Sequence, residues 1–291
     1  MLVVDKPRGL TSHDVVAAAR RALGETRIGH TGTLDPLATG VLPLACGRAT
    51  RLVRFLTASD KEYEAEIRLG LATDTFDITG REVARSDRRP ASAEIVAALE
   101  ALSGEYLQTP PPYSAKKIAG RRAYELARAD VAVQPSPARV RVDCLELLDV
   151  RGDVAAVRLT CSAGFYVRSL AQELGVRLGI GACLEALRRT RSGQFHLLDA
   201  IAFELMVGNP VAAASKMVPL TALLPQFPAI TLTDEGLRWV SHGRMIGPRH
   251  LSGPPPEGVA WVRLMGQDGT LVALGEPAGT SGALHPSVVL H

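Results

Sequence analysis

The segment from Gly29 to Gly40, GHTGTLDPLATG, constrains the fold of this chain more than any other stretch. It holds a single carboxylate, Asp35, directly before Pro36, and the glycines of the segment, Gly29, Gly32 and Gly40, lie on either side of this pair. Because proline disfavours the helical region for the preceding residue, Asp35 is pushed toward an extended backbone, while the glycines permit tight turns or close approach of a ligand. The segment therefore predicts a loop that presents one carboxylate. Taken alone, such a residue fits a turn as well as a catalytic site.

Size and composition indicate an ordered globular protein. The chain has 291 residues, enough for a large core and for two domains, since single cores stop growing near about 250–300 residues. Hydrophobic residues make up 46% of it and charged residues 22%, which argues against disorder. The net charge of +3 is too mild to indicate a polyanionic partner by itself. Local clusters of arginine and lysine have to decide that question.

Cysteine usage and hydropathy exclude several classes of protein. The four cysteines are widely spaced, with no CxxC pair and no histidine at ligand spacing, which argues against a zinc site and against a disulfide framework. They are Cys46, Cys144, Cys161 and Cys183. We expect reduced, structural thiols and no bound metal. No signal peptide and no apolar run of membrane-spanning length are visible, so we expect a cytoplasmic protein with no membrane contact.

Periodicity predicts the elements on either side of the Asp35 loop. Thr11 and Ser12 are suited to cap a helix that runs to Leu23 with one apolar stripe. From Tyr63 to Leu69, apolar residues alternate with charged ones, which predicts a half-buried strand whose inward face begins at Tyr63. Further along, we expect two strands at about 139–150 and 154–162, and a helix over YVRSLAQELGVRLG that carries Arg168 in its first turn.

A basic segment lies beyond a triple proline. A strand from Glu105 runs into Pro110–Pro112, which a regular sheet would not tolerate, so we expect a protruding insertion over about residues 105–130. Its cations stand among tyrosines, a composition suited to tracking RNA phosphates, although a solvated helix face gives the same pattern. They include Lys116, Lys117, Arg121 and Arg122, and Arg188, Arg189 and Arg191 are candidates to extend the basic surface.

The C-terminal quarter of the chain reads as a separate small unit. The segment 220–228 contains two prolines and looks like a boundary. After it, LTDEGLRWVSHGRMI predicts a helix, and Asp268-Gly269 between two alternating segments predicts a hairpin.

Four motifs, GHTGTLDPLATGVLP, KEYEAEIRLG, PPPYSAKKIAGRRAYELAR and GFYVRSLAQELG, occur in the order seen in bacterial tRNA pseudouridine-55 synthases, the TruB family of pseudouridine synthases. The chain resembles this family over nearly its whole length. The resemblance implies an α+β catalytic domain over residues 1–227, with a mixed, largely antiparallel central sheet and a thumb-like insertion, followed by a PUA-like RNA-binding domain over 228–291. Met1 lies close to the first motif, so we expect a short family leader to be absent.

The same resemblance implies an activity and a partner. Enzymes of this family isomerise the uridine at position 55 in the T loop of tRNA, which they flip out of its stack. The implied reaction needs no cofactor, and the implied partner is the T arm of tRNA, bound by a monomer without an obligatory protein partner. An additional tRNA-folding role is compatible with the basic surface.

Site residues follow from the motifs that match. The resemblance implies that Asp35 acts at C1′, either as nucleophile or through a glycal route, that Arg168 pairs with it, and that Tyr63 stacks on the base and carries a proton. It also implies RNA or substrate contacts for a second set of residues. These are His30, Leu187, Tyr166, Arg51 (where the family has lysine), Lys116, Lys117, Arg121 and Arg122.

Two alternatives remain open at this point. One is a guide-dependent or ribosomal RNA pseudouridine synthase, although the thumb-like PPPYSAKK segment favours the stand-alone tRNA enzyme. The other is an RNA-binding and RNA-folding protein that requires no catalysis. Replacement of Asp35 by asparagine separates this second class from an enzyme, because only an enzyme would lose its function.

Overall fold

A computed structural model describes residues 1–113, 117–118, 121–122, 136–279 and 282–290. Within these residues the larger sheet has the strand order β14-β1-β3-β12-β4-β11-β10-β7, with β13 beside β12 and β2 beside β3. Its strands are β1 (Leu2–Lys6), β2 (Ile28–His30), β3 (Ala38–Cys46), β4 (Lys61–Leu69), β7 (Gly104–Gln108), β10 (Ala138–Arg151), β11 (Val154–Cys161), β12 (Ala182–Ser192), β13 (Phe195–His196) and β14 (Ile201–Ala202). Only the β1–β14 and β3–β12 pairs are parallel. The expected mixed, largely antiparallel sheet and the α+β class are confirmed.

Helices cover this sheet unequally. They are α1 (Ser12–Leu23), α2 (Val53–Thr57), α3 (Ser92–Glu100), α5 (Val167–Arg177), α6 (Phe203–Gly208) and α7 (Pro210–Ser215), with the 3-10 helices η1 (Gly47–Leu52), η2 (Leu197–Asp199) and η3 (Leu220–Ala222). Residues of α1, α3, α5 and α6 share one hydrophobic cluster with the inward face of β4. The charged face of β4 lies opposite, where Glu64 and Glu66 pair with Arg158 and Arg151. One face of the sheet therefore carries α1, α3, α5 and α6, whereas α2 packs with Val3 and Val41 on the other face.

Local sequence explains why α1 and β4 form as predicted. The Thr11 hydroxyl accepts from the Asp14 amide, the Asp14 carboxylate accepts from the Thr11 amide, and Gly24 closes the helix with a φ of 63°. Along β4 the apolar side chains of the alternating pattern are buried, with Tyr63 8% exposed and Ile67 fully buried. The predicted starts of α1 and of the inward face of β4 are confirmed.

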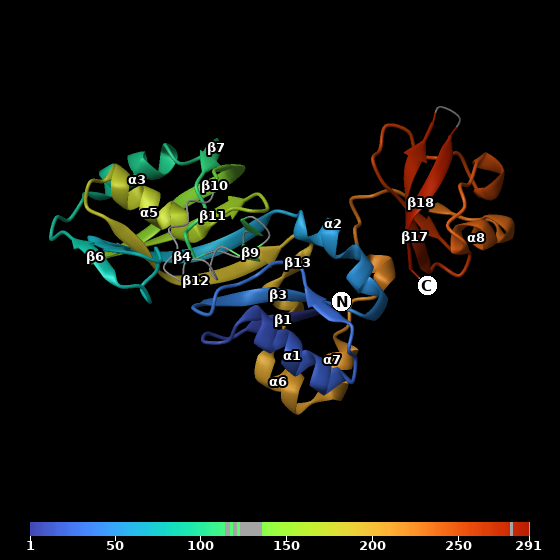
Figure 1. Cartoon of the computed structure of the whole chain (residues 1–291), viewed down its shortest axis with the longest axis horizontal. Helices are drawn as coiled ribbons and strands as arrows, with labels where there is room; N and C mark the ends of the chain where they lie inside the picture. The colour runs from blue at the N-terminus through green and yellow to red at the C-terminus, as the bar shows by residue number, and fades with distance from the viewer. Residues whose placement is uncertain (114–116, 119–120, 123–135, 280–281, 291) are drawn as a thin grey trace.

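The smaller sheet has the order β15-β16-β17-β18 and lies in a separate lobe with α8 (Figure 1). Its elements are β15 (Ala229–Thr231), α8 (Asp234–Ser241), η4 (Pro248–His250), β16 (Val262–Met265), β17 (Leu271–Ala278) and β18 (Ala283–Val289). The hairpin predicted around Asp268-Gly269 is confirmed, because β16 and β17 pair antiparallel. One hydrophobic cluster joins Val3 and Val41 of the larger sheet to Leu274 of the smaller one. The division at 227/228 stays a prediction.

Two short hairpins complete the described elements. β5 (Leu71–Thr73) pairs with β6 (Glu82–Arg85), and β8 (Lys117–Ile118) pairs with β9 (Arg121–Arg122) within the predicted insertion. β7 belongs to the larger sheet, because residues 104–108 pair with β10, so the chain leaves the sheet only after Gln108. Lys116 lies outside the described residues.

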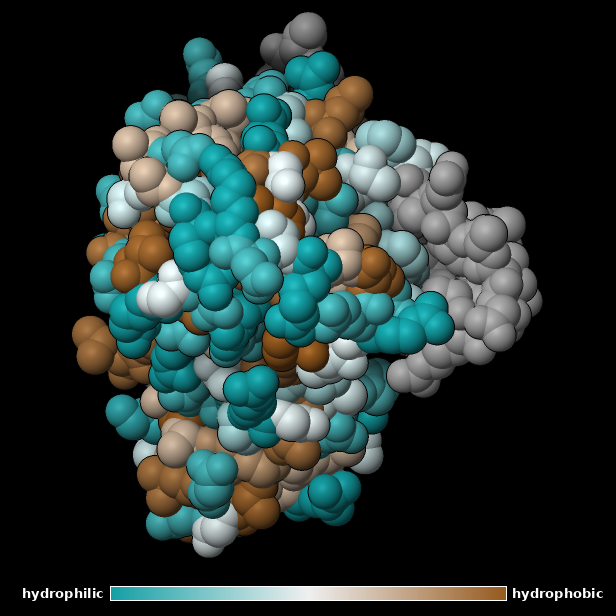
Figure 2. All heavy atoms as spheres, turned by 90° about the vertical axis from the view of Figure 1, so that its left-hand side faces the viewer, coloured by the Kyte–Doolittle hydropathy of each residue, from teal (hydrophilic) through white to brown (hydrophobic). Residues whose placement is uncertain are grey.

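The end of the molecule that carries β6 and α3 is mostly hydrophilic, with apolar residues in separate spots (Figure 2). Two of its arginines are paired locally, since Arg85 contacts Glu82 and Arg88 contacts Glu94. Among the described residues, no helix is both long and apolar enough to cross a membrane.

Candidate active site

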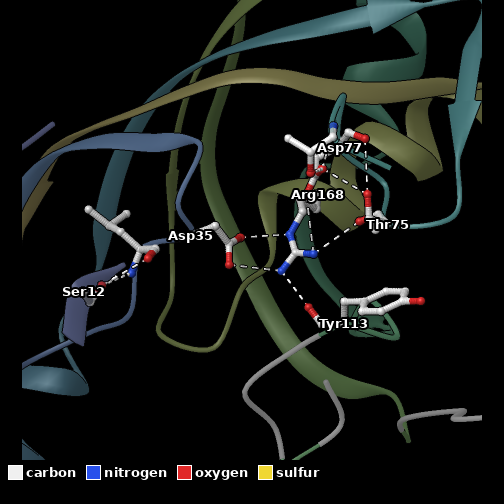
Figure 3. A network of polar contacts seen from close by, with 8 residues as sticks. Ser12, Asp35, Thr75, Asp77, Tyr113 and Arg168 are labelled. Atoms are coloured by element: carbon white, nitrogen blue, oxygen red, sulfur yellow. Dashed lines mark hydrogen bonds and ion pairs between the residues drawn. The ribbon is translucent and has the colours of Figure 1, made fainter. Parts of the chain in front are cut away.

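The loop that carries Asp35 connects β2 to β3 and is fixed on both sides of the carboxylate. On one side, the Ser12 hydroxyl at the start of α1 accepts from the Leu34 amide at 2.8 Å and donates to the Leu34 carbonyl at 3.1 Å (Figure 3). On the other side, the Gly9 amide donates to the Pro36 carbonyl at 2.7 Å. Asp35 therefore stands between two anchored neighbours, as a residue with a geometric task should.

Asp35 points at Arg168, which lies in the first turn of α5 (Figure 3). Arg168 Nε lies 2.9 Å from Asp35 Oδ2, and Arg168 Nη2 donates to Asp35 Oδ1 at 3.2 Å. The contact is thus a two-pronged pair of charge-assisted hydrogen bonds. The side chain of Arg168 is only 7% exposed, whereas that of Asp35 is 36% exposed. The buried guanidinium therefore orients a carboxylate that solvent can reach. The family resemblance had implied that these two residues pair.

The remaining donors of Arg168 reach two other segments. Nη1 donates to the Thr75 carbonyl at 3.2 Å and lies 3.7 Å from Asp77 Oδ2, while Nη2 donates to the Tyr113 carbonyl at 2.9 Å. The guanidinium therefore joins Asp35, the loop after β5 and the start of the predicted insertion. All three nitrogens of the planar guanidinium make contacts, and the ammonium group of a lysine could not reproduce this geometry.

Asp77 is a site residue that the sequence analysis missed. Its side chain is 7% exposed, and its Oδ1 accepts from the Thr75 hydroxyl at 3.0 Å and from the Thr79 amide at 3.0 Å. Phe76, between them, adopts a φ of 64°, which is rare for a residue other than glycine. The alternation of threonine and aspartate in TDTFDIT was an available signal for such a self-bonded turn, but nothing in it pointed to Arg168.

The N-terminus of α5 is held against β7 and the chain that follows. The Tyr166 amide donates to Gln108 Oε1 at 2.8 Å, and Gln108 Nε2 donates back to the Tyr166 carbonyl at 3.2 Å. The Ser169 hydroxyl donates to the Thr109 carbonyl at 2.7 Å. These contacts fix the turn of helix that carries Arg168, and they place Tyr166 beside the site.

Tyr63 lies on β4, with Leu159 of β11 and Arg189 of β12 as its register partners. Burial raises the pKa of its phenol, and the positive charge of Arg189 opposes that rise. The group is therefore a neutral phenol at neutral pH. Leu187 is 8% exposed and faces the same way, because it pairs with Ala65 on β4.

Buried cations gather beneath the Asp35 loop. Lys6 is fully buried, and its Nζ donates to the Pro7 and Leu10 carbonyls at 2.8 Å and 2.7 Å. Burial lowers the pKa of Lys6 to about 8, against the attraction of Asp35. Lys61 is 6% exposed, and burial together with the charge of Arg189 lowers its pKa to about 8. Arg189 is only 1% exposed, so the expectation that it extends a basic surface is wrong.

The other predicted residues lie at varied positions. His30 ends β2 in register with Leu44 of β3, at the start of the Asp35 loop. Arg51 lies in η1 and donates to the Val289 carbonyl of β18, so it connects η1 to the smaller sheet and does not contact Asp35. Lys117 lies on β8, and Arg121 and Arg122 on β9. Among the described residues, no group of three histidine, cysteine or acidic side chains is arranged to hold a metal.

Solved structures share this fold. The chain superposes over its whole length on 84% of a protein in a Cbf5-Nop10-Gar1 complex, with a TM-score of 0.76 and 28% identity. It matches a chain of an H/ACA RNP bound to a substrate RNA containing 2'-deoxyuridine with a TM-score of 0.74 and 26% identity, again over all of this chain and 84% of that one.

Sequence comparison identifies the class and then the family. The family model for the N-terminal domain of TruB family pseudouridylate synthases matches residues 20–167. A tRNA pseudouridine synthase B of Solibacter usitatus is 41% identical over all of this chain and 99% of its own, and one of Aromatoleum aromaticum is 41% identical over 98% and 91%. The chain is therefore a pseudouridine synthase, which is an isomerase. It belongs to the TruB family.

Proposed function

We propose that this protein converts the uridine at position 55, in the T loop of tRNA, into pseudouridine. The observation that carries the proposal is the Asp35–Arg168 pair, in which a partly exposed carboxylate is oriented by a buried guanidinium at 2.9 Å. Relatives that are 41% identical over nearly their whole length are named for action on tRNA, which favours tRNA over the other substrate RNA named for a more distant structural neighbour.

The reaction exchanges one bond for another without redox change. The bond between C1′ of the ribose and N1 breaks, and its electron pair leaves with the base. After the base turns, C5 bonds to C1′, C5 loses a proton and N1 gains one. No atom is gained, so no cofactor is needed. Asp35 supports the step either by attacking C1′ or by assisting removal of the 2′ proton.

The neighbours of Asp35 have roles that fit their surroundings. Arg168 orients the carboxylate and keeps its negative charge paired until the ribose arrives. Tyr63, a neutral phenol, offers an aromatic face to the base and one transferable proton. Leu187 and Tyr166 complete the wall of the site, and His30 lies where the Asp35 loop begins.

RNA has to be held while its base leaves the stack, which costs a few kcal/mol. We assign this binding to the insertion that begins after Gln108, with its basic residues, and to the smaller sheet. The protein acts on the T arm as a monomer in the cytoplasm, without an obligatory protein partner. Binding of the T arm also supports a role in tRNA folding.

The test uses unmodified tRNA transcript and purified protein without metal or nucleotide, and maps pseudouridine by chemical probing that stops reverse transcription. Asp35→Asn should bind the transcript and form no product, because it keeps the shape of the side chain and removes its charge. Asp143→Asn is the matched control, since that exposed carboxylate pairs, within the described part of the chain, only with Arg141 at 2.7 Å. Product from Asp35→Asn would contradict the assignment of the acid, and product outside the T loop would favour the guide-dependent or ribosomal alternative.

A further inference from the structure

Arg189 is one of the largest fully buried side chains of the described residues, at 1% exposure. No carboxylate among those residues lies within 4.0 Å of its guanidinium, unlike Arg168 with its two aspartates. A buried charge without an opposite charge is costly, so proteins retain one only where hydrogen bonds and a specific task support it.

The hydrogen bonds of Arg189 go to the two arms of the Asp35 loop. Nη2 donates to the Gly32 carbonyl at 3.1 Å, three residues before Asp35, and Nε donates to the Val41 carbonyl at 2.7 Å, six residues after it. One planar group thus connects the ascending arm of the loop to the strand that leaves it. Because both acceptors are backbone carbonyls, these two contacts fix the path of the chain. A hydrogen bond between the side chains of Arg189 and Tyr63 adds to them.

The backbone around Arg189 is fitted to the same loop. Arg189 is the register partner of Gly40 in the parallel β3–β12 pair. Gly40 has a φ of 101°, and a Cβ placed there would lie 2.2 Å from the Arg189 carbonyl oxygen. Strand β12 can approach the loop only because this position is glycine.

The charge of Arg189 also acts on the floor of the site. It opposes the burial that raises the pKa of Tyr63, and it contributes to the lowered pKa of Lys6 and of Lys61. Arg189 is therefore in electrostatic reach of the proposed proton carrier, and in direct contact with the loop of the proposed nucleophile.

We propose that Arg189 is a positioning residue for the isomerisation, which clamps the Asp35 loop through Gly32 and Val41 and holds a fixed positive charge beside Tyr63. The inference rests on the proposed function, because it acts through Asp35. Lysine keeps the charge but lacks the planar fork that spans both carbonyls, whereas glutamine loses the charge as well. The two substitutions therefore separate the clamp from the charge.

The experiment compares Arg189→Lys and Arg189→Gln with Arg158→Lys and Arg158→Gln in the full chain. Arg158 is the matched control, because it lies on the outer face of β11, is 45% exposed and pairs with Glu64 at 3.0 Å. Three quantities are measured: the single-turnover rate of pseudouridine formation at saturating tRNA transcript, the affinity for that transcript, and hydrogen–deuterium exchange of the backbone amides. Circular dichroism checks the fold of each variant.

For Arg189→Lys we expect a rate lowered by about 100-fold, as for a displacement near 1 Å, and an affinity within about threefold of the unchanged protein. Exchange should rise in residues 31–41 and stay unchanged in β10 and β11. Arg189→Gln should be slower still, and both Arg158 variants should keep the rate within about threefold.

Three results would overturn the proposal. They are an Arg189→Lys variant that reacts at the original rate, a rise of exchange spread over the whole sheet, and failure of Arg189→Lys to fold, which would make the residue a general support of the sheet. Equal rates for the lysine and glutamine variants would show that the positive charge of Arg189 does not contribute to the rate, and would contradict that part of the proposal. If the unchanged protein formed no pseudouridine in the T loop, the proposed function would fail, while the exchange data would still test the clamp.

Discussion

Replacing Ser12 with alanine should separate catalysis from stability, because this hydroxyl is the link between α1 and the Asp35 loop. Ser12 and Leu34 are each 2% exposed, and the hydroxyl satisfies both the amide and the carbonyl of Leu34. Alanine keeps the helix and removes only the oxygen. The amide and the carbonyl of Leu34 then have no partner unless the loop moves toward water.

The size of the effect follows from these two bonds. A buried polar group that loses its partner costs about 1–3 kcal/mol, so the pair would cost about 2–6 kcal/mol if the loop stayed in place. A shift of the loop is the cheaper outcome, and a displacement of about 1 Å at Asp35 is enough to lower the rate by about 100-fold. We therefore expect a modest loss of global stability and a large loss of turnover.

The matched control is Thr11→Ala, one residue earlier. The Thr11 hydroxyl accepts from the Asp14 amide and does not contact the loop, so its removal should cost about 0.5–2 kcal/mol of stability and leave turnover intact. Urea unfolding gives the stabilities, and single-turnover assays at saturating tRNA transcript give the rates. The reasoning is refuted if Ser12→Ala loses stability but reacts as fast as Thr11→Ala.

Three further outcomes are expected. Arg168→Lys should lower the single-turnover rate by about 100-fold or more with little change in transcript affinity, because one ammonium cannot make both bonds to Asp35; equal rates would contradict this. Gly40→Ala should unfold at clearly lower urea concentration, because its Cβ would lie 2.2 Å from a backbone oxygen; an unchanged midpoint would show that β3 and β12 separate freely. Lys61, with a folded pKa of about 8 against 10.5 when unfolded, binds its proton less well in the folded state, so stability should rise as pH rises above 8, by about 1 kcal/mol between pH 7 and pH 9. Lys61→Met should remove that part of the rise in urea titrations at the two pH values.

Features that depend on neighbours in the sequence were predictable. The cap at Thr11 and the closing Gly24 lie within a few residues of the helix that they end, and the alternation from Tyr63 records burial directly. Asp35 was singled out because proline and glycine restrict its own backbone. Its pairing with Arg168 came from the family resemblance, because 133 residues separate the two and no local pattern joins them.

Contacts that depend on the fold were not predictable in this way. Asp77 carries a recognisable self-bonded turn, but its proximity to Arg168 arises because the segment after β5 bonds to β12, through the Ile78 amide and the Leu184 carbonyl. Arg189 reads as one cation among several in LRRTRS, and only the register of β12 against β3 and β4 decides that it is buried while its neighbours are not. The two-residue period of a strand could not predict which face of the sheet Arg189 lies on, because β12 has register shifts on either side of this stretch.

The supports of Asp35 come from widely separated parts of the chain, and this has a consequence for how the site forms. Ser12 begins α1, Arg168 lies in α5 and Arg189 on β12, so the loop reaches its working geometry only when the N-terminal and C-terminal parts of the larger sheet have paired. The parallel β3–β12 pair is the step that brings them together. A carboxylate held this way needs no adjustment at the moment of reaction, which is where preorganised sites gain their rate. Substitutions that weaken the β3–β12 pair should therefore lower turnover before they unfold the protein.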